Sequence, residues 1–157
     1  MFRHLLVPTD GSDLSLAAVR QAIALARESA ARMTVVHVME RLLLTPQGAL
    51  FGDAAGFDPE LLQRVHQAEQ AQAQAVLGEA RRLAEAGGVV CDAVLREQGV
   101  IHEAILETAA SQGCDLIFMA SHGRRGLAGL VLGSVTQRVL NHSELPVLVY
   151  RQPGSAA

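Results

Sequence analysis

The chain has 157 residues, of which 50% are hydrophobic and 18% are charged, values that fit one domain with a sizeable core. The formal net charge is -3 and aromatic residues make up 3%, so the surface lacks both the basic charge and the stacking side chains that nucleic-acid binding uses. Every basic residue is an arginine. The lack of lysine excludes a Walker A loop, a Schiff-base enzyme and a lysine-dependent kinase site, as these are usually built.

The amino terminus does not have the pattern of a signal peptide, because its short apolar run is interrupted at Pro8 and Asp10. No apolar stretch approaches the roughly 20 residues that span a bilayer. Cys91 and Cys114 lie far apart and form no CxxC motif, a pattern typical of buried thiols in a reducing compartment. We therefore expect a cytoplasmic protein without a membrane partner.

Short runs of Val, Ile and Leu alternate with long alanine-rich segments, a pattern that predicts strands alternating with helices. We expect the first strand over 4–9 and the second over 33–39, joined by a helix that Ser12 or Asp13 caps. After the second strand the pattern breaks. Residues 40–57 contain a proline and several glycines, and they predict a surface excursion or lid.

A long helix is predicted to begin at Asp58 and Pro59 and to end before the Gly87-Gly88 pair. Its predicted apolar stripe includes Val65 and Leu83. The remaining expected elements are a strand over 89–96 with one exposed face, a helix over 100–111, a strand over 115–120, a glycine-rich loop, a helix opening near Gly133 and a strand over 147–150.

Five strands joined by four helices predict one doubly wound α/β domain over 1–151, with helices on both faces of a parallel sheet and a flexible tail over 152–157. In such a sheet, ligands bind beyond the carboxyl ends of the strands, where the winding reverses. Two loops at such ends have a suitable composition. One runs from Pro8 to Ser12 and the other from Met119 to Thr136.

The second loop has the composition of a phosphate site, because glycines let backbone amides approach an anion and the helix start adds partial positive charge. Ser134 would add a hydroxyl donor. Asp10 would repel phosphates unless a divalent cation lies between them, so we assign it to Mg2+ or to a ribose hydroxyl. From the residues alone, helix capping by Asp10 and Ser12, with simple turns at the glycines, is an equally good interpretation.

Several short segments share a pattern with a known family: LLVPTDGS at 5–12, VVHV at 35–38, MASHGRRG at 119–126, LGSVT at 132–136 and LPVLV at 145–149. Along nearly its whole length the chain resembles the universal stress proteins. Nucleotide-binding members of that family carry Gly, two residues, Gly, nine residues, then Gly followed by Ser or Thr. Gly123, Gly133 and Ser134 match this motif, and Ala120 replaces its first glycine. Whether that methyl group crowds a ligand depends on the backbone conformation at Ala120.

The resemblance implies the nucleotide alpha hydrolase-like sheet order 3-2-1-4-5 and ATP, or another adenine nucleotide, with Mg2+ at Asp10 between the first and fourth strands. The implied ribose and metal neighbours are Pro8, Thr9 and Asp10, and those of the adenine are Val38 and Met119. The implied phosphate neighbours are Gly123, Gly133, Ser134, Val135 and Thr136, and Ala120 belongs to the site in place of the first motif glycine. Arg124 and Arg125 are additional phosphate partners in this interpretation, although exposed loop arginines are more often solvated.

The resemblance also implies a homodimer, because the order 3-2-1-4-5 leaves the apolar strand 147–150 at a sheet edge. It implies a stress-response sensor with at most slow ATP hydrolysis. No nucleophile elbow, HExxH motif or Cys/His cluster appears, and we assign no catalytic residue. The alternative is a dimer that binds no nucleotide and acts through protein partners, and Ala120 is the feature that favours it.

Overall fold

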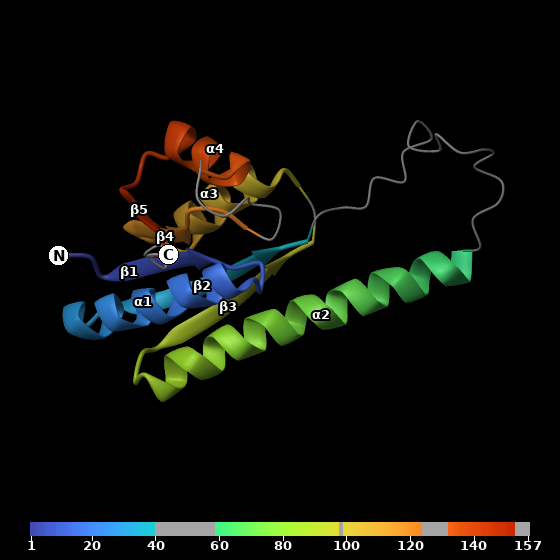
Figure 1. The fold of residues 1–157 in the computed structure, drawn as a ribbon, viewed down its shortest axis with the longest axis horizontal. Helices are drawn as coiled ribbons and strands as arrows, with labels where there is room; N and C mark the ends of the chain where they lie inside the picture. Colours follow the sequence, from blue (N-terminus) through green and yellow to red (C-terminus); the bar gives the residue numbers. More distant parts are fainter. Residues whose placement is uncertain (40–58, 98, 124–131, 153–157) are drawn as a thin grey trace, which may run out of the picture.

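The structure is a computed structural model that describes residues 1–39, 59–97, 99–123 and 132–152. The excursion predicted over 40–57 lies outside these residues, as does nearly all of the predicted tail. The described residues form a parallel five-stranded sheet of order β3-β2-β1-β4-β5, with helices on both faces (Figure 1). The predicted doubly wound fold and its strand order are confirmed.

The elements occur where the sequence predicts them, with strand ends shifted by one or two residues at most. In chain order they are β1 (His4–Pro8), α1 (Asp13–Ser29), β2 (Arg32–Val38), α2 (Pro59–Ala86), β3 (Cys91–Arg96), α3 (Ile101–Ser111), β4 (Leu116–Ala120), α4 (Ser134–His142) and β5 (Val147–Tyr150).

Each face of the sheet covers its own hydrophobic cluster, because successive side chains of a strand point to opposite faces. In β1, Leu5 and Val7 join the cluster that packs against α1 and α2, whereas Leu6 joins the cluster beneath α3 and α4. All three side chains are fully buried, as expected for a central strand of a parallel sheet. The central strands are therefore packed on both faces, and they carry the cleft described below at their carboxyl ends.

Helix α1 begins with a side-chain cap and ends with an unusual backbone conformation. The hydroxyl of Ser12 accepts a hydrogen bond from the amide of Ser15 at 3.2 Å, which confirms the predicted cap. At the other end Ala30 has a φ of 51°, in the left-handed region, and the amide of Ala31 donates to the carbonyl of Ala26 at 2.8 Å. Glycine usually occupies such a position, so no sequence signal marked this helix end.

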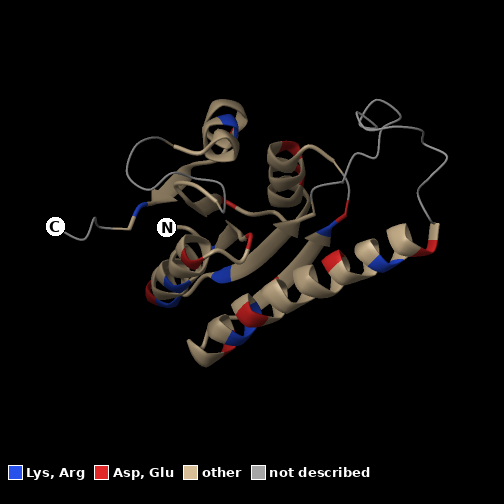
Figure 2. Ribbon diagram, turned by 45° about the vertical axis from the view of Figure 1, so that its right-hand side comes forward, with Lys and Arg blue, Asp and Glu red and all other residues tan. Residues whose placement is uncertain are grey.

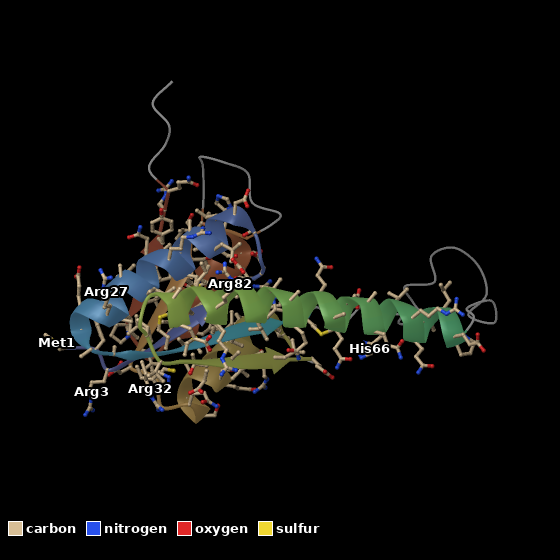
Figure 3. The ribbon with its side chains drawn as sticks, turned by 90° about the horizontal axis from the view of Figure 1, so that it is seen from below. Met1, Arg3, Arg27, Arg32, His66 and Arg82 are labelled. Atoms are coloured by element: carbon tan, nitrogen blue, oxygen red, sulfur yellow. The ribbon has the colours of Figure 1, made fainter. Side chains whose placement is uncertain are left out.

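Helix α2 is much longer than the strand it covers. Its 28 residues span about 42 Å, and the side chains that it buries, Ala73, Leu77, Ala80 and Ala84, all belong to its carboxyl-terminal half. The other half continues past the sheet, with His66 on that outer part (Figure 3). Val65, predicted on the buried stripe, is 38% exposed, because the sheet does not extend far enough to cover it.

Charged residues are spread along α1 and α2 (Figure 2). Two ion pairs join residues one turn apart near the end of α2, Arg82 with Glu79 at 2.8 Å and Arg81 with Glu85 at 3.1 Å. Such exposed pairs contribute at most about 1 kcal/mol each. No helix within the described residues combines the length and apolar character needed to cross a membrane.

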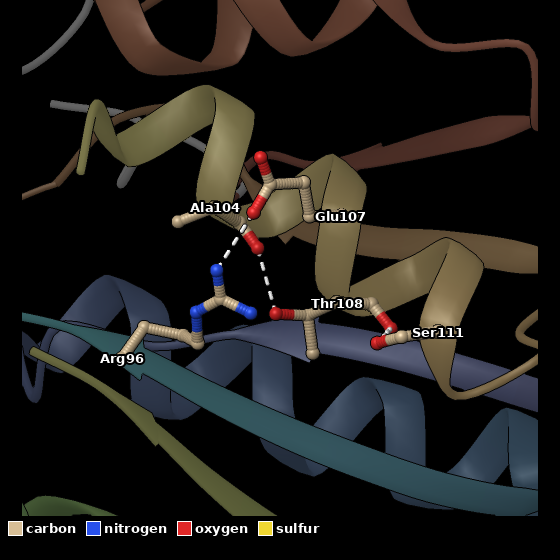
Figure 4. A network of polar contacts seen from close by, with 5 residues as sticks. All are labelled: Arg96, Ala104, Glu107, Thr108 and Ser111. Atoms are coloured by element: carbon tan, nitrogen blue, oxygen red, sulfur yellow. Dashed lines mark hydrogen bonds and ion pairs between the residues drawn. The ribbon is translucent and has the colours of Figure 1, made fainter. Parts of the chain in front are cut away.

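On the other face, α3 is held to the end of β3 by a polar contact. The guanidinium of Arg96 donates to the carboxylate of Glu107 at 2.7 Å, and beside it the buried hydroxyl of Thr108 donates to the carbonyl of Ala104 at 2.6 Å (Figure 4). The thiols of Cys91 and Cys114 are buried and form no disulfide, as predicted, and burial raises the pKa of each to about 11.

Candidate functional site

A cleft of about 510 Å3 opens at the carboxyl ends of β1 and β4, a volume within the usual range for small-molecule sites. The winding of the sheet reverses between these two strands, because α1 covers one face and α4 covers the other. Apart from Arg124 and Arg125, which lie outside the described residues, every residue predicted for the site lines this cleft. These residues are Pro8, Thr9, Asp10, Val38, Met119, Ala120, Gly123, Gly133, Ser134, Val135 and Thr136.

The turn after β1 is held by hydrogen bonds within the chain. The amide of Thr9 donates to the carbonyl of Val36 at 2.9 Å, and the amide of Ser12 donates to the Oδ1 atom of Asp10 at 2.9 Å. Gly11 has a φ of 77°, which a residue with a side chain rarely adopts. The turn and cap interpretation of Asp10 and Ser12 is therefore correct for these bonds.

The glycine-rich loop meets this turn at Gly123. A Cβ atom placed on Gly123 would lie 2.5 Å from the Oδ2 atom of Asp10, a distance that real Cβ atoms do not show. The two loops predicted from the sequence are therefore in direct contact. A side chain at this position would displace the carboxylate of Asp10, because the backbone passes against it.

A second close approach occurs at Gly133, where the loop returns to the sheet. The amide of Gly133 donates to the carbonyl of Ser121 at 2.8 Å, and a Cβ atom at Gly133 would lie 3.1 Å from the Cα atom of His122. Gly133 also precedes α4, which begins without a side-chain cap. The first amides of a helix have no partner within it, and those of α4 belong to Ser134, Val135 and Thr136, which line the cleft.

Ala120, the position at which the motif has alanine in place of glycine, has an ordinary strand conformation. It pairs with Tyr150 of β5, its carbonyl accepts a hydrogen bond from the hydroxyl of Thr136 at 3.1 Å, and it is 7% exposed. Among the described residues other than glycine, only Ala30 has a positive φ. The backbone at this position therefore does not depend on the conformational freedom of glycine.

The cleft also contains residues that were not predicted for the site. They are Ser15, Val36, His37, Met39, Glu69, Gln72, Ala73, Ile101, Ile105 and His122. Glu69 and Gln72 come from α2 and Ile101 and Ile105 from α3, and nothing in their local sequence marks them. His37 had a signal, because it immediately precedes Val38 at the end of a predicted strand.

The polar side chains of the cleft do not form a ready-made metal site. Within the described part of the chain, no three side chains of His, Cys, Asp or Glu are grouped so as to hold a metal ion. A carboxylate oxygen is nevertheless the kind of ligand that Mg2+ accepts, usually together with water and phosphate oxygens. The assignment of Mg2+ to Asp10 therefore stays a prediction.

Comparison with known proteins gives the family. The model of the universal stress protein family matches residues 1–151. The chain belongs to this family. A universal stress protein of Methanocaldococcus jannaschii, MJ0531, is 33% identical over 98% of this chain and 84% of its own length. The resemblance inferred from the sequence segments is confirmed.

Solved structures of the family show the same arrangement. That of MJ0577, another universal stress protein of Methanocaldococcus jannaschii, superposes with a TM-score of 0.81 at 26% identity and covers 99% of both chains. A universal stress protein solved in complex with cAMP superposes with a TM-score of 0.66 at 26% identity, and 97% of this chain and 98% of that chain are covered. The cleft of the present protein thus belongs to a fold on which at least one family member binds an adenine nucleotide.

Proposed function

We propose that this universal stress protein binds an adenine nucleotide, ATP with Mg2+, in the cleft between β1 and β4. The observation that carries the proposal is the pair of close approaches at Gly123 and Gly133, where a Cβ atom would displace the carboxylate of Asp10 or lie tightly against the backbone of His122. Glycines at such positions keep backbone amides within reach of a phosphate, and the uncapped start of α4 adds donors and partial positive charge.

The two parts of the cleft suit the two parts of a nucleotide. Val38 and Met119 lie on its apolar side with Ile101 and Ile105, where the adenine would be bound. The phosphates would lie against the glycine positions and the start of α4. The ribose would lie between these parts, at the turn after β1. The family member solved with cAMP supports this choice of ligand.

Mg2+ would be held by the carboxylate of Asp10, and when bound it would supply the positive charge that lets a carboxylate and a triphosphate occupy one cleft. The backbone amides would be the main phosphate anchor, since the chain has no lysine. We propose a stress-response sensor of the cytoplasm with at most slow hydrolysis of ATP. The domain boundaries proposed are 1–151 for the folded domain and 152–157 for the tail.

Two measurements test the function. Mass spectrometry of the purified, denatured protein should detect adenine nucleotide carried through purification. Titration calorimetry should show that ATP binds more tightly with Mg2+ than with EDTA, and that Asp10→Ala weakens binding in Mg2+ but changes it little in EDTA. Equal affinity of the wild type with and without metal would contradict the role of Mg2+.

Absence of nucleotide binding under all conditions would favour a dimer that acts through protein partners. That alternative depended on Ala120, whose ordinary strand conformation means only that the backbone there does not require a glycine.

We further propose that β5 forms a homodimer with the same strand of a second copy. Within the described sheet β5 pairs only with β4, its residues are only half buried, and Leu148 is 38% exposed. Unpaired apolar edges of this kind invite pairing, and a twofold axis would satisfy both copies. Light scattering at micromolar concentration should report a dimer with or without ATP. Val149→Lys should disrupt this dimer. Val90→Lys, at an exposed valine just before β3, is the control that should leave the dimer intact. A monomeric wild type would contradict this proposal.

A further inference from the structure

Two histidines meet where α3 packs against α4. His102 lies in the first turn of α3 and His142 is the last residue of α4, and the two helices lie side by side on one face of the sheet (Figure 1). The centres of the two imidazole rings are 5.3 Å apart, with an angle of 44° between the ring planes. Neither histidine lines the cleft. The proposed nucleotide site therefore does not account for this pair.

A hydrogen bond of His142 determines which of its ring nitrogens can bind a ligand. The Nδ1 atom lies 2.8 Å from the carbonyl oxygen of Arg138, one turn earlier in α4. A carbonyl oxygen only accepts, so Nδ1 donates, and in the neutral ring the lone pair is then on Nε2. Histidines that bind metal ions usually donate their other ring nitrogen to a carbonyl or carboxylate in this way. The backbone thus holds His142 in the form that can bind a metal ion through Nε2.

The separation of the two rings suits one shared metal ion. Zinc–nitrogen bonds are about 2.0–2.1 Å long and zinc sites are usually tetrahedral, so two imidazoles bound to one ion have ring centres about 5 Å apart. The distance between His102 and His142 agrees with this value. Within the described residues, no group is hydrogen-bonded to the ring of His102, so neither of its nitrogens is committed to a structural role there.

The surroundings of the pair favour a cation that exchanges with solvent. His142 is exposed and His102 is half-buried. The last carbonyls of a helix carry partial negative charge, which stabilises a cation at the end of α4. The charged residues closest to the pair in the chain are Glu103, Arg138 and Glu144, which are exposed and together carry a net negative charge.

We propose that His102 and His142 bind one Zn2+ ion between α3 and α4, with water in the remaining coordination positions. The site prefers a transition-metal ion to Mg2+, because imidazole nitrogen suits zinc and hard cations prefer oxygen ligands. The two histidines are far apart in the sequence and come together only in the folded chain, so the ion stabilises the packing of α3 on α4. This site is separate from the cleft and does not depend on the proposed nucleotide binding.

Titration calorimetry with zinc chloride tests the site on the full chain, after treatment with a chelator and without added nucleotide. The wild type should bind Zn2+ at the pair. His102→Gln and His142→Gln should each weaken this binding by about tenfold or more, since removal of even a group that orients a metal ligand has an effect of that size. The double variant should bind little more weakly than either single variant, because loss of one histidine already destroys the chelate. His66→Gln, at an exposed histidine of α2, is the matched control and should bind like the wild type.

Two further measurements separate a shared ion from simple packing of the rings. Zn2+ should raise the melting temperature of the wild type and of His66→Gln, but not that of His102→Gln or His142→Gln. In nitrogen NMR spectra of the wild type, the Nε2 signal of His142 should shift when Zn2+ is added, while Nδ1 keeps its proton. Melting curves without metal show whether each variant is folded, and the NMR spectra of the wild type decide alone if one is not.

The contrary results are equally specific. If the wild type binds no Zn2+, the two rings only pack against each other and the proposal is wrong. If His102→Gln or His142→Gln keeps the wild-type affinity, the ion binds at other side chains. Independent, additive losses in the double variant would indicate two separate surface sites, and binding without a rise in melting temperature would contradict the link between α3 and α4. All of these results leave the proposed nucleotide binding untouched.

Discussion

The two ends of β1 present the same residue types in different surroundings. At the amino end, the Nε2 atom of His4 lies 2.8 Å from the hydroxyl of Thr34. The carboxylate of Asp115 accepts hydrogen bonds from the amides of Arg3 and His4, both at 2.9 Å. At the carboxyl end, His37 donates to the backbone and a carboxylate accepts from a nearby amide. Both ends thus use a histidine and an aspartate to hold backbone segments together.

The difference between the two ends is the space beside the polar groups. His4 is 3% exposed, and its burial together with the nearby charge of Arg32 lowers the pKa of its imidazole. His37 and Asp10 instead border a cleft of about 510 Å3. The same side-chain chemistry is therefore enclosed where the chain closes around it, and it borders open space where the strands end in a cleft.

The largest expected effect is on binding at the open end. Gly133→Val should reduce the affinity for ATP by ~100-fold or more, about 2.7 kcal/mol, because its side chain meets the backbone of His122 and fills the phosphate end of the cleft. The fold should persist, since the φ of -60° at Gly133 suits any residue. Gly78→Val is the matched control, because a Cβ atom there meets nothing within 4 Å. Calorimetry and melting curves measure both quantities, and retained affinity in Gly133→Val would place the phosphate anchor elsewhere.

The next effect separates the two aspartates. Asp115→Ala should lower the free energy of unfolding by about 1–2 kcal/mol, because two backbone amides lose a charged acceptor. Asp10→Ala removes the bond to the amide of Ser12, and we expect it to cost about 1 kcal/mol or below. Urea unfolding of both variants checks the order, and ATP titration should give the opposite order. If Asp10→Ala proves the more destabilising variant, the carboxyl end is as structural as the amino end.

The smallest effect is a pH dependence at the closed end. Because the folded state lowers the pKa of His4, the unfolded state binds more protons in acid. The contribution of neutral His4 is therefore complete above about pH 6.5 and is lost as the pH falls toward the folded pKa. His4→Gln should reduce the fall in unfolding free energy between pH 7.5 and pH 5.5 by about 1 kcal/mol or less. His66→Gln, on the outer part of α2, is the control. Equal slopes for the wild type and His4→Gln would contradict the burial argument.

The sequence predicted the strands well because apolar runs such as Leu5 to Val7 reflect burial on both faces, which is a local property of the chain. The strand order came from the resemblance to a family and not from periodicity. The sequence predicted that Gly123 and Asp10 lie near each other, since both follow strands that the sheet order places side by side, but it did not predict their direct contact. Their atomic distance depends on the packing of both loops.

Other features could not be predicted because they depend on where elements end in space. Periodicity placed Val65 on the buried stripe of α2, but it does not indicate where the sheet stops. Glu69 and Ile101 reach the cleft from helices on opposite faces of the sheet, and no local pattern marks such residues. For His37 the strand end was predicted, but its hydrogen bond to the carbonyl of Thr9 depends on the turn after a different strand.

The left-handed conformation of Ala30 has a consequence for protein engineering. An L-residue in this region costs about 1–2 kcal/mol relative to a right-handed conformation, and asparagine tolerates it better than alanine does. Ala30 lies at the carboxyl end of α1, close to the start of β2, and so near the amino ends of the strands, whereas the cleft lies at their carboxyl ends. Ala30→Asn should therefore raise the free energy of unfolding at a position remote from the cleft. In that background, the protein should stay folded with cleft substitutions that would unfold the natural chain.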